Sequence, residues 1–304
     1  MPAPSGEQFE ISFGDQRATI VEVGGGVRSY RDGERDVLDP YPLERICDGA
    51  HGTVLVPWPN RLRDGSYEFD GERLQLALTE PEKHNAIHGL LRWVNWQPLV
   101  HDAARVVMGV RLHPQPGYPF ELEVSVEYSL GEQGLIVVTG ARNAGERPCP
   151  YGAGQHPYLS PGEGTLDRCT LELPAETLIE TDPERSLPSG RSPVAGGPLD
   201  FREPRAIGST AIDSPFEDLL RDGDGLARAR LSAPDGRTVE LWVDEAYPLL
   251  EVYTGDTLEP HRRRRGLGLE PMTCPPDAFR SGESLIRLDP GEAHRAVWGV
   301  RLAG

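Results

Sequence analysis

Seven Asp-Gly dipeptides punctuate this chain of 304 residues, and they constrain its fold more than any other local feature. They begin at residues 32, 48, 64, 70, 222, 224 and 235. Asp-Gly suits the tight turn of a β-hairpin, because both residues tolerate positive φ. The segment DGSYEFDGERLQL, residues 64–76, places a short alternating strand between two such turns. It therefore predicts a meander of antiparallel strands.

Several segments between these turns alternate apolar and polar residues with a period of two, as half-buried strands do. Examples are LEVSVEY, residues 122–128, and RTVELWVD, residues 237–244. No apolar pattern of helical period lasts beyond a turn or two, and the 35 glycines and 29 prolines disfavour helices. Strands without helices must bury their apolar faces against another sheet. The sequence therefore predicts an all-β sandwich or barrel.

The length suits one large β domain or two smaller domains. The loosest segment, LPSGRSPVAGGP at residues 187–198, could divide two domains. Because alternating strands of similar character lie on both sides of it, we interpret it as a surface loop. We expect a single domain over residues 1–304.

The 31 basic residues against 48 acidic residues give a net charge of −17. Such a surface repels nucleic acid and anionic membranes, so we expect a neutral small molecule as the partner. No apolar run reaches the length of a membrane span, the start of the chain has no apolar signal core, and the four cysteines include no C-x-x-C pair. These features predict a cytoplasmic protein with reduced thiols. Both a monomer and a homodimer are compatible with the sequence.

Six clusters join polar side chains to Gly or Pro, as residues around a concavity often do. They lie at residues 57–65, 84–89, 151–159, 211–219, 266–279 and 288–294. In YGAGQHPYL, residues 151–159, Gly152 and Gly154 free the backbone before His156, while Pro157 restricts the backbone after it. We interpret this arrangement as one that aims a single imidazole.

The polar residues of these clusters suit a sugar. Groups such as Asn60 satisfy ring hydroxyls, and an aromatic ring such as Trp58 or Trp93 covers the apolar face of the sugar. The chain has no phosphate-binding loop of the G-x-x-x-x-G-K-[ST] type, no dinucleotide fingerprint and no G-x-S-x-G elbow.

The clusters also resemble a known family. PWPNR before a DG turn, N-x-x-HG, QHPY, LEPMTCPPDAF and a late PGE occur here in the order typical of the aldose 1-epimerases, or mutarotases. The resemblance runs from about residue 50 to the C-terminus. It implies a large antiparallel β-sandwich, called a supersandwich. It also implies interconversion of the α and β anomers of a free hexose, such as glucose or galactose, without a cofactor or metal.

Motif by motif, the resemblance assigns the general acid to His156 of QHPY and the general base to Glu292 of PGEA. It assigns contacts with the sugar to Arg61 of PNR, His88 of AIHG and Asp213 of IDSPF. We add Asn60 and Trp58 of PWPNR as substrate-binding candidates, for the reasons given above.

One departure from the family pattern concerns substrate choice. Met272 stands where galactose-handling members carry glutamine, and a thioether cannot donate a hydrogen bond to a sugar hydroxyl.

Alternative interpretations stay open at this level. The spacing His84-x-x-x-His88 suggests zinc, although no third ligand is apparent, and Arg61 could simply pair with Asp64. The run HRRRR, residues 261–265, suggests an anion clamp for a phosphorylated or sulfonated sugar. A protein that binds a carbohydrate without catalysis is a third possibility.

Overall fold

The computed structural model describes residues 3–303. In that range the chain forms strands β1 to β27, the short 3-10 helices η1 (Pro81–Lys83) and η2 (Leu166–Arg168), and a single α-helix, α1 (Ala278–Ser281). Neighbouring strands are antiparallel in both large sheets. The all-β prediction is confirmed. Within the described range, no helix is long and apolar enough to cross a membrane.

The larger sheet has twelve strands, and ten of them follow one path across it. In spatial order these ten are β1 (Gln8–Phe13), β2 (Gln16–Val21), β3 (Val27–Asp32), β4 (Arg35–Leu38), β16 (Tyr158–Leu159), β25 (Leu267–Met272), β24 (Leu249–Tyr253), β21 (Asp213–Leu219), β18 (Ala175–Thr181) and β19 (Pro188–Pro193). The short strand β15 (Gly154–Gln155) pairs with β25 and with β5 (Val54–Leu55).

The second sheet has nine strands. Their spatial order is β10 (Gln97–Asp102), β11 (Arg105–Leu112), β12 (Leu122–Gly131), β13 (Gly134–Asn143), β27 (Ala293–Ala303), β23 (Thr238–Val243), β22 (Ala227–Ser232), β17 (Thr170–Glu172) and β20 (Arg205–Ala206). Three two-stranded sheets complete the fold: β14 (Cys149–Tyr151) with β26 (Ile286–Leu288), β6 (Arg61–Arg63) with β9 (Asn85–Ile87), and β7 (Ser66–Phe69) with β8 (Glu72–Gln75).

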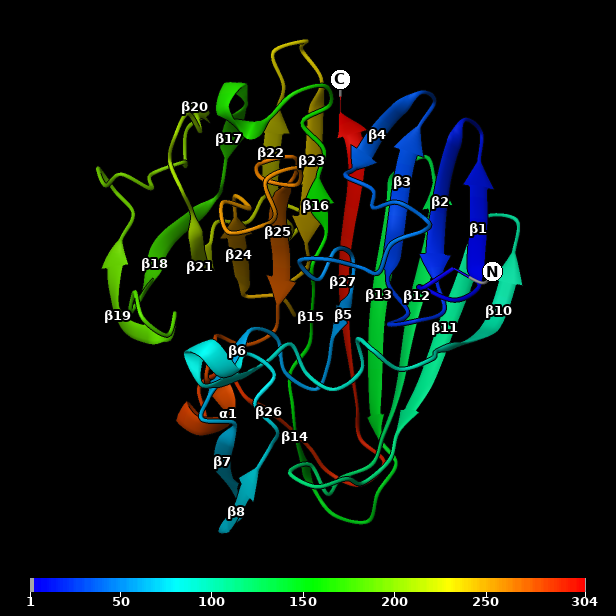
Figure 1. Cartoon of the computed structure of the whole chain (residues 1–304), viewed down its shortest axis with the longest axis vertical. Coiled ribbons are helices and arrows are strands. Elements are labelled where there is room, and N and C mark those ends of the chain that lie inside the picture. Colours follow the sequence, from blue (N-terminus) through cyan, green and yellow to red (C-terminus); the bar gives the residue numbers. More distant parts are fainter. Residues whose placement is uncertain (1–2, 304) are drawn as a thin grey trace.

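The two large sheets pack face to face. Strands β1 and β2 contact β12 of the other sheet, and Figure 1 shows the blue strands lying beside the green ones. One continuous hydrophobic core contains Ile11 and Ile20 from the larger sheet together with Val124 and Trp298 from the smaller one. Along β12 every second side chain is buried, as its alternation predicts. The architecture is therefore a β-sandwich.

The hairpin prediction holds for one of the two Asp-Gly turns in residues 64–76. Asp70 and Gly71 have φ of 50° and 78° and join β7 to β8, as a tight hairpin turn requires. The turn at Asp64 leads out of β6, which pairs with β9 rather than with β7. Its strands therefore do not continue the meander.

The segment at residues 187–198 differs from its predicted state. Half of it, Pro188–Pro193, forms β19, an edge strand that pairs with β18, rather than a surface loop. Its side chains are intermediate or exposed, and it contains Pro188 and Pro193 at its ends. Proline is tolerated at the edge of a sheet, where one side of the strand needs no partner.

Candidate active site

His156 lies in the centre of the larger sheet, between β15 and β16. Its backbone N–H donates to the Thr53 carbonyl at 3.1 Å, and its carbonyl accepts from the Gly52 N–H at 2.8 Å. The preceding residue, Gln155, is fully buried and donates to the Tyr128 hydroxyl at 2.8 Å, while its own oxygen accepts from the Trp298 indole at 3.1 Å. Both sheets thus fix the backbone that carries the imidazole.

The glycines before His156 serve a different purpose from the one predicted. Neither Gly152 nor Gly154 has a left-handed backbone. A Cβ at Gly152 would lie 2.6 Å from the Cys274 sulfur, and one at Gly154 would lie 2.9 Å from the Pro271 carbonyl oxygen. These glycines permit close packing against β25 and the segment that follows it, which brings His156 next to that strand.

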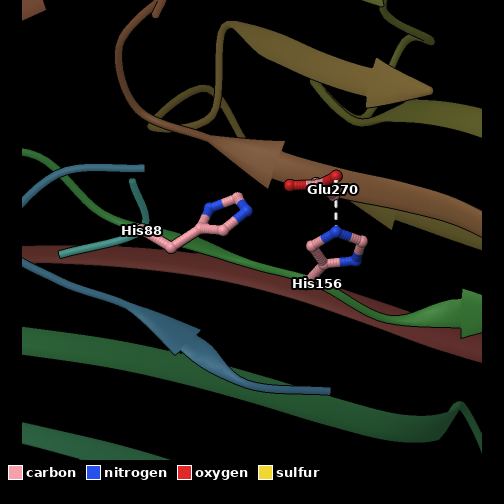
Figure 2. Close-up of side chains that lie close together, drawn as sticks. All are labelled: His88, His156 and Glu270. Carbon is pink, nitrogen blue, oxygen red and sulfur yellow. Dashed lines mark ion pairs between the residues drawn. The ribbon is translucent and has the colours of Figure 1, made fainter. Parts of the chain in front are cut away.

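Glu270 of β25 faces His156. Its Oε1 lies 3.0 Å from His156 Nε2, and both side chains are almost completely buried (Figure 2). A Cβ at Gly268, two residues earlier on β25, would lie 3.3 Å from His156 Cε1, so the glycine leaves room for the ring. Glu270 Oε2 and His156 Nδ1 are buried without a hydrogen-bond partner. Unpaired buried polar atoms are rare and often mark a position that a ligand completes.

A second buried carboxyl, Glu251, lies beside this pair. Glu251 on β24 stands directly opposite Glu270 on β25. Burial raises the pKa of Glu251 well above its ordinary value, and the nearby Asp213 and Glu270 carboxylates raise it further. Two neighbouring buried carboxyls do not both ionise readily. We therefore interpret Glu251 as a protonated carboxyl next to the ion pair of Glu270 with His156.

His88 completes a histidine pair. Its ring lies edge-on to that of His156, with 5.6 Å between the ring centroids. Figure 2 shows both imidazoles on the same side of Glu270. Burial lowers the pKa of His88 well below its ordinary value, and nearby positive groups, His156 first among them, act in the same direction. His88 is thus neutral at physiological pH, with an unpaired Nδ1.

A cavity of about 450 Å³ opens beside these residues. Its wall includes Asn60, Arg61, His88, His156, Asp213 and Glu270. The volume falls in the usual range for a pocket that takes a small molecule. Five of the predicted site residues therefore line one cavity together with Glu270, although they come from four separate segments of the chain.

Contacts with other side chains hold Arg61 and Asn60 in the cavity wall. Arg61 makes a two-point ion pair with Glu80, with Nε to Oε2 at 3.0 Å and Nη2 to Oε1 at 3.1 Å, and its Nη2 lies 3.9 Å from Asp213. The alternative pairing of Arg61 with Asp64 does not occur, because Asp64 pairs with His84 and Arg185. The Asn60 amide donates to Glu251 at 3.2 Å.

Trp58 does not line the cavity. It is buried in the hydrophobic core and packs against Phe279, with 5.6 Å between the rings. The prediction that Trp58 binds substrate is therefore wrong, because no face of its ring is open. Trp93, which we also considered as an aromatic platform, lines the cavity and is 49% exposed.

Glu292 lies away from His156. It is exposed in the turn before β27, where its Oε2 accepts from the backbone N–H of Asp289 at 2.9 Å, and it is not part of the cavity wall. The predicted pairing of His156 with Glu292 is therefore wrong. The carboxylate that the fold brings to the imidazole is Glu270.

The HRRRR run does not form an anion clamp in this cavity. Arg262 is paired with Asp39 at 2.9 Å, and Arg264 is paired with Asp256 at 3.0 Å. The other two arginines, Arg263 and Arg265, are exposed, and no residue of the run belongs to the cavity wall. The clamp hypothesis is wrong for these residues, because the buried ones already hold carboxylates.

The three side chains in Figure 2 could also hold a metal ion. His88, His156 and Glu270 each offer a donor atom, and these atoms lie within 4.8 Å of one another. Two imidazoles and a carboxylate are a common set of zinc ligands. His84 does not belong to this set. Its ring is exposed and pairs with Asp64 at 3.0 Å.

Sequence reasoning missed Glu270 and Glu251 as site residues. Each is a single acidic residue within a strand of buried residues, LGLEPM for Glu270 and LLEVY for Glu251. A carboxyl in an apolar strand is costly to bury without a purpose, and that contrast is the signal that could have identified both. Met272 lies on the same strand as Glu270 but packs with Ile179 and Leu249 and does not line the cavity.

Comparison with known proteins identifies the family. The family model described as aldose 1-epimerase matches residues 7–301. The uncharacterized protein YihR of Escherichia coli K12 is 35% identical over 298 residues, which cover 97% of this chain and 93% of YihR. This chain belongs to the aldose 1-epimerase family. The resemblance found in the motifs is thereby confirmed.

A less similar relative and two solved structures extend the comparison. The galactose mutarotase of Sus scrofa is 27% identical over 335 residues, covering 99% of this chain and 96% of that protein. Two solved structures share the fold. An aldose epimerase homologue from C. elegans has a TM-score of 0.84 at 19% identity, covering 98% of this chain and 99% of that one. A galactose mutarotase-like protein from Clostridium acetobutylicum has a TM-score of 0.83 at 20% identity, covering 97% and 94%. The predicted supersandwich is confirmed.

Proposed function

We propose that this member of the family is an aldose 1-epimerase that interconverts the α and β anomers of a free hexose, with Glu270 as the base and His156 as the acid. The observation that carries the proposal is the 3.0 Å separation between Glu270 Oε1 and His156 Nε2 beside the cavity. In a cyclic sugar the anomeric hydroxyl and the ring oxygen are bonded to the same carbon. An acid and a base that serve both oxygens at once must therefore be neighbours, as these two groups are.

The reaction proceeds by two proton transfers in each direction. Glu270 removes the proton of the anomeric hydroxyl while His156 Nε2–H protonates the ring oxygen, so the bond from C1 to the ring oxygen breaks and C1 becomes an aldehyde. The open chain rotates about its C1–C2 bond. On closure from the other face His156 takes back the proton from the ring-forming hydroxyl, and Glu270 returns its proton to the new anomeric oxygen. The step needs no hydride transfer and no cofactor.

The other wall residues hold the sugar. Neutral His88 and the Arg61 guanidinium can bond sugar hydroxyls, while Asp213 accepts hydrogen bonds from them. Glu251 is interpreted as protonated and lies opposite Glu270, so it adds no second negative charge next to the base. The Glu80 contact keeps the Arg61 side chain in one orientation, which favours a fixed position of the substrate.

The test is anomer exchange of glucose and galactose, followed by NMR or polarimetry. We expect Glu270→Gln and His156→Asn each to lower the rate by about 10²- to 10⁴-fold, because each removes one proton-transfer group. Glu292→Gln is the matched control and should keep the wild-type rate, since its carboxylate is exposed and outside the cavity. A large loss in Glu292→Gln with near wild-type exchange in Glu270→Gln would reverse the assignment.

The same assay separates catalysis from binding alone. Saturable sugar binding without any anomer exchange would make the chain a carbohydrate-binding protein. We further propose a cytoplasmic location, for which the four free cysteines are the supporting observation, and a monomer or homodimer that works without nucleic acid or membrane.

A further inference from the structure

Arg92 is an unusual arginine in this chain. It lines the same cavity as His156 and Glu270, it is half-buried, and its guanidinium makes no hydrogen bond or ion pair with any residue in 3–303. Every other arginine in that range whose side chain is buried or half-buried has such a partner, whereas the other unpartnered arginines are exposed. A half-buried cation without a partner is costly and suggests that a ligand supplies the missing charge.

The other two cations of the cavity wall are already neutralised. Arg61 holds Glu80 through two contacts, and Lys83 Nζ lies 3.8 Å from the same carboxylate and donates to the Ser186 hydroxyl at 2.9 Å. Neither is free to balance a negative charge on a bound molecule. Arg92 is therefore the wall cation whose guanidinium contacts no carboxylate, and Glu80 acts on it only from a longer distance.

Arg92 keeps its positive charge in the wall of the cavity. Burial lowers the pKa of its guanidinium, which stays protonated at any physiological pH. Its positive charge also contributes to the lowered pKa of His88, so it acts on the group that faces the sugar. The guanidinium carbon lies 5.4 Å from the centre of the Trp93 ring, which supports the side chain from one side.

We propose that Arg92 binds an anionic substituent of the substrate, so that the preferred sugar is an aldose carrying a carboxylate, phosphate or sulfonate group. This inference rests on the proposed anomer exchange and narrows its substrate class. Because Glu270 and His156 take the anomeric carbon, the anionic group belongs on another carbon of the sugar. A planar guanidinium matches two oxygens of any of these three groups, and Trp93 offers an apolar surface beside it.

The charge of the whole chain makes a local cation necessary. With a net charge of −17, the protein repels an anionic sugar at long range. Salt screens that repulsion beyond roughly 8 Å at physiological ionic strength, whereas a direct contact with Arg92 inside a cavity is screened much less. A single unpaired guanidinium can therefore select an anion that the rest of the surface disfavours.

The experiment measures kcat/KM for anomer exchange by the full chain with four sugars: glucose, glucuronate, glucose 6-phosphate and glucose bearing a C6 sulfonate. We expect at least one anionic sugar to exceed glucose by about tenfold or more, because a charge-assisted contact is worth that much in binding. The three anionic arms identify which oxygen-bearing group fits.

Two variants assign the effect to a residue. Arg92→Gln should lower the ratio of kcat/KM for the anionic sugar to that for glucose by about tenfold or more, mainly through KM, and Arg92→Lys should keep part of the preference. Arg265→Gln is the matched control, because this arginine is exposed, outside the cavity, and in the HRRRR run. It should keep the full preference.

The outcomes are separable. Exchange of glucose with no preference for any anionic sugar overturns the role of Arg92 and leaves the proposed function standing. A preference that persists in Arg92→Gln, or that Arg265→Gln removes equally, also overturns it. If Arg92→Gln does not fold, the test uses the ratio of kcat/KM for the anionic sugar to that for glucose in the wild type and in Arg92→Lys. No preference in the wild type, or an undiminished preference in Arg92→Lys, then overturns the role of Arg92. No exchange with any of the four sugars overturns the proposed function, and this inference falls with it.

Discussion

Two buried clusters of charged side chains both contact the ring of Tyr158, and only the cluster around His156 faces the cavity. The ring of Tyr158 stacks on His156 at 4.8 Å and on His51 at 3.6 Å, measured between ring centroids. In the cluster around His51, Asp39 Oδ2 lies 3.2 Å from His51 Nε2 and 2.9 Å from Arg262 Nη2. The Arg262 Nε lies 3.4 Å from Asp48. Each charge in this cluster has an opposite charge beside it.

The cluster around His156 also contains histidines and a carboxylate, but several of its polar atoms have no partner. His156 and Glu270 form one pair, but Glu270 Oε2, His156 Nδ1 and His88 Nδ1 have no partner, and the cavity lies beside them. The comparison shows that buried histidines and carboxylates do not by themselves mark a site. In the His51 cluster Arg262 Nε also lacks a hydrogen bond, but Asp48 lies 3.4 Å from it and the cluster is outside the cavity wall. What distinguishes the site is that its unbonded polar atoms lie next to a space for a ligand.

The largest expected difference between the clusters is in stability. Arg262→Ala should lower the free energy of unfolding by about 3 to 5 kcal/mol, because it leaves the Asp39 carboxylate buried with less compensation. Glu270→Gln should cost less, because the glutamine side chain has the same shape and can still hydrogen-bond His156 Nε2, and no carboxylate is left buried without a cation. Urea unfolding followed by circular dichroism measures both.

Arg263→Ala is the control for this comparison, since its side chain is exposed. We expect it to change the free energy of unfolding by no more than about 0.5 kcal/mol. Equal losses for Arg262→Ala and Glu270→Gln would contradict the view that one cluster is structural and the other is not.

The sequence predicted the sandwich because the fold depends on local patterns. The alternation in residues 122–128 directly determines which side chains of β12 face the core. The resemblance likewise grouped Arg61, His88, His156 and Asp213 as one site, and the match of an amide to sugar hydroxyls added Asn60; all five line the cavity. These predictions needed only periodicity, side-chain chemistry and a resemblance.

Glu270, the proposed base, could not be found in the same way, because its position depends on pairing between distant strands. Glu270 reaches His156 only because β25 pairs with both β15 and β16. This pairing joins segments more than a hundred residues apart in the sequence. Glu292 has a more conspicuous turn around it but lies in the turn just before β27, which begins at Ala293. Similarly, Trp58 stands between two prolines, and only the packing against Phe279 shows that it is closed off.

A smaller effect concerns pH and the carboxyl opposite the base. Because the pKa of Glu251 is raised in the folded protein, the native state holds a proton that the unfolded state releases above its ordinary pKa of about 4.3. The free energy of unfolding should therefore fall as pH rises above that value, by at most about 1.4 kcal/mol per pH unit from this group. Glu251→Gln mimics the protonated carboxyl and should reduce this slope. Urea titrations at about pH 5 and about pH 7 measure it, and an identical slope in the variant would show that another group carries the proton.

The smallest effect on activity is expected from a metal chelator, which tests whether the cluster around His156 needs a metal ion. A chelator should leave anomer exchange unchanged, because proton transfer by Glu270 and His156 suffices for the reaction. Added Zn²⁺ should inhibit, since the donors of His88, His156 and Glu270 lie within 4.8 Å of one another and two of the imidazole nitrogens are unpaired. His88→Gln should weaken zinc inhibition relative to its own zinc-free rate, whereas His84→Gln, outside the cavity, should not. Loss of activity on chelation would instead show that these three residues bind a metal ion that the reaction needs.

The cluster around His51 offers no such site, because Asp39 and Arg262 already contact the His51 Nε2. Zinc inhibition that depends on His88 would therefore show that the His156 cluster differs from the His51 cluster in having metal-binding atoms without a partner, and not in the number of its buried charges.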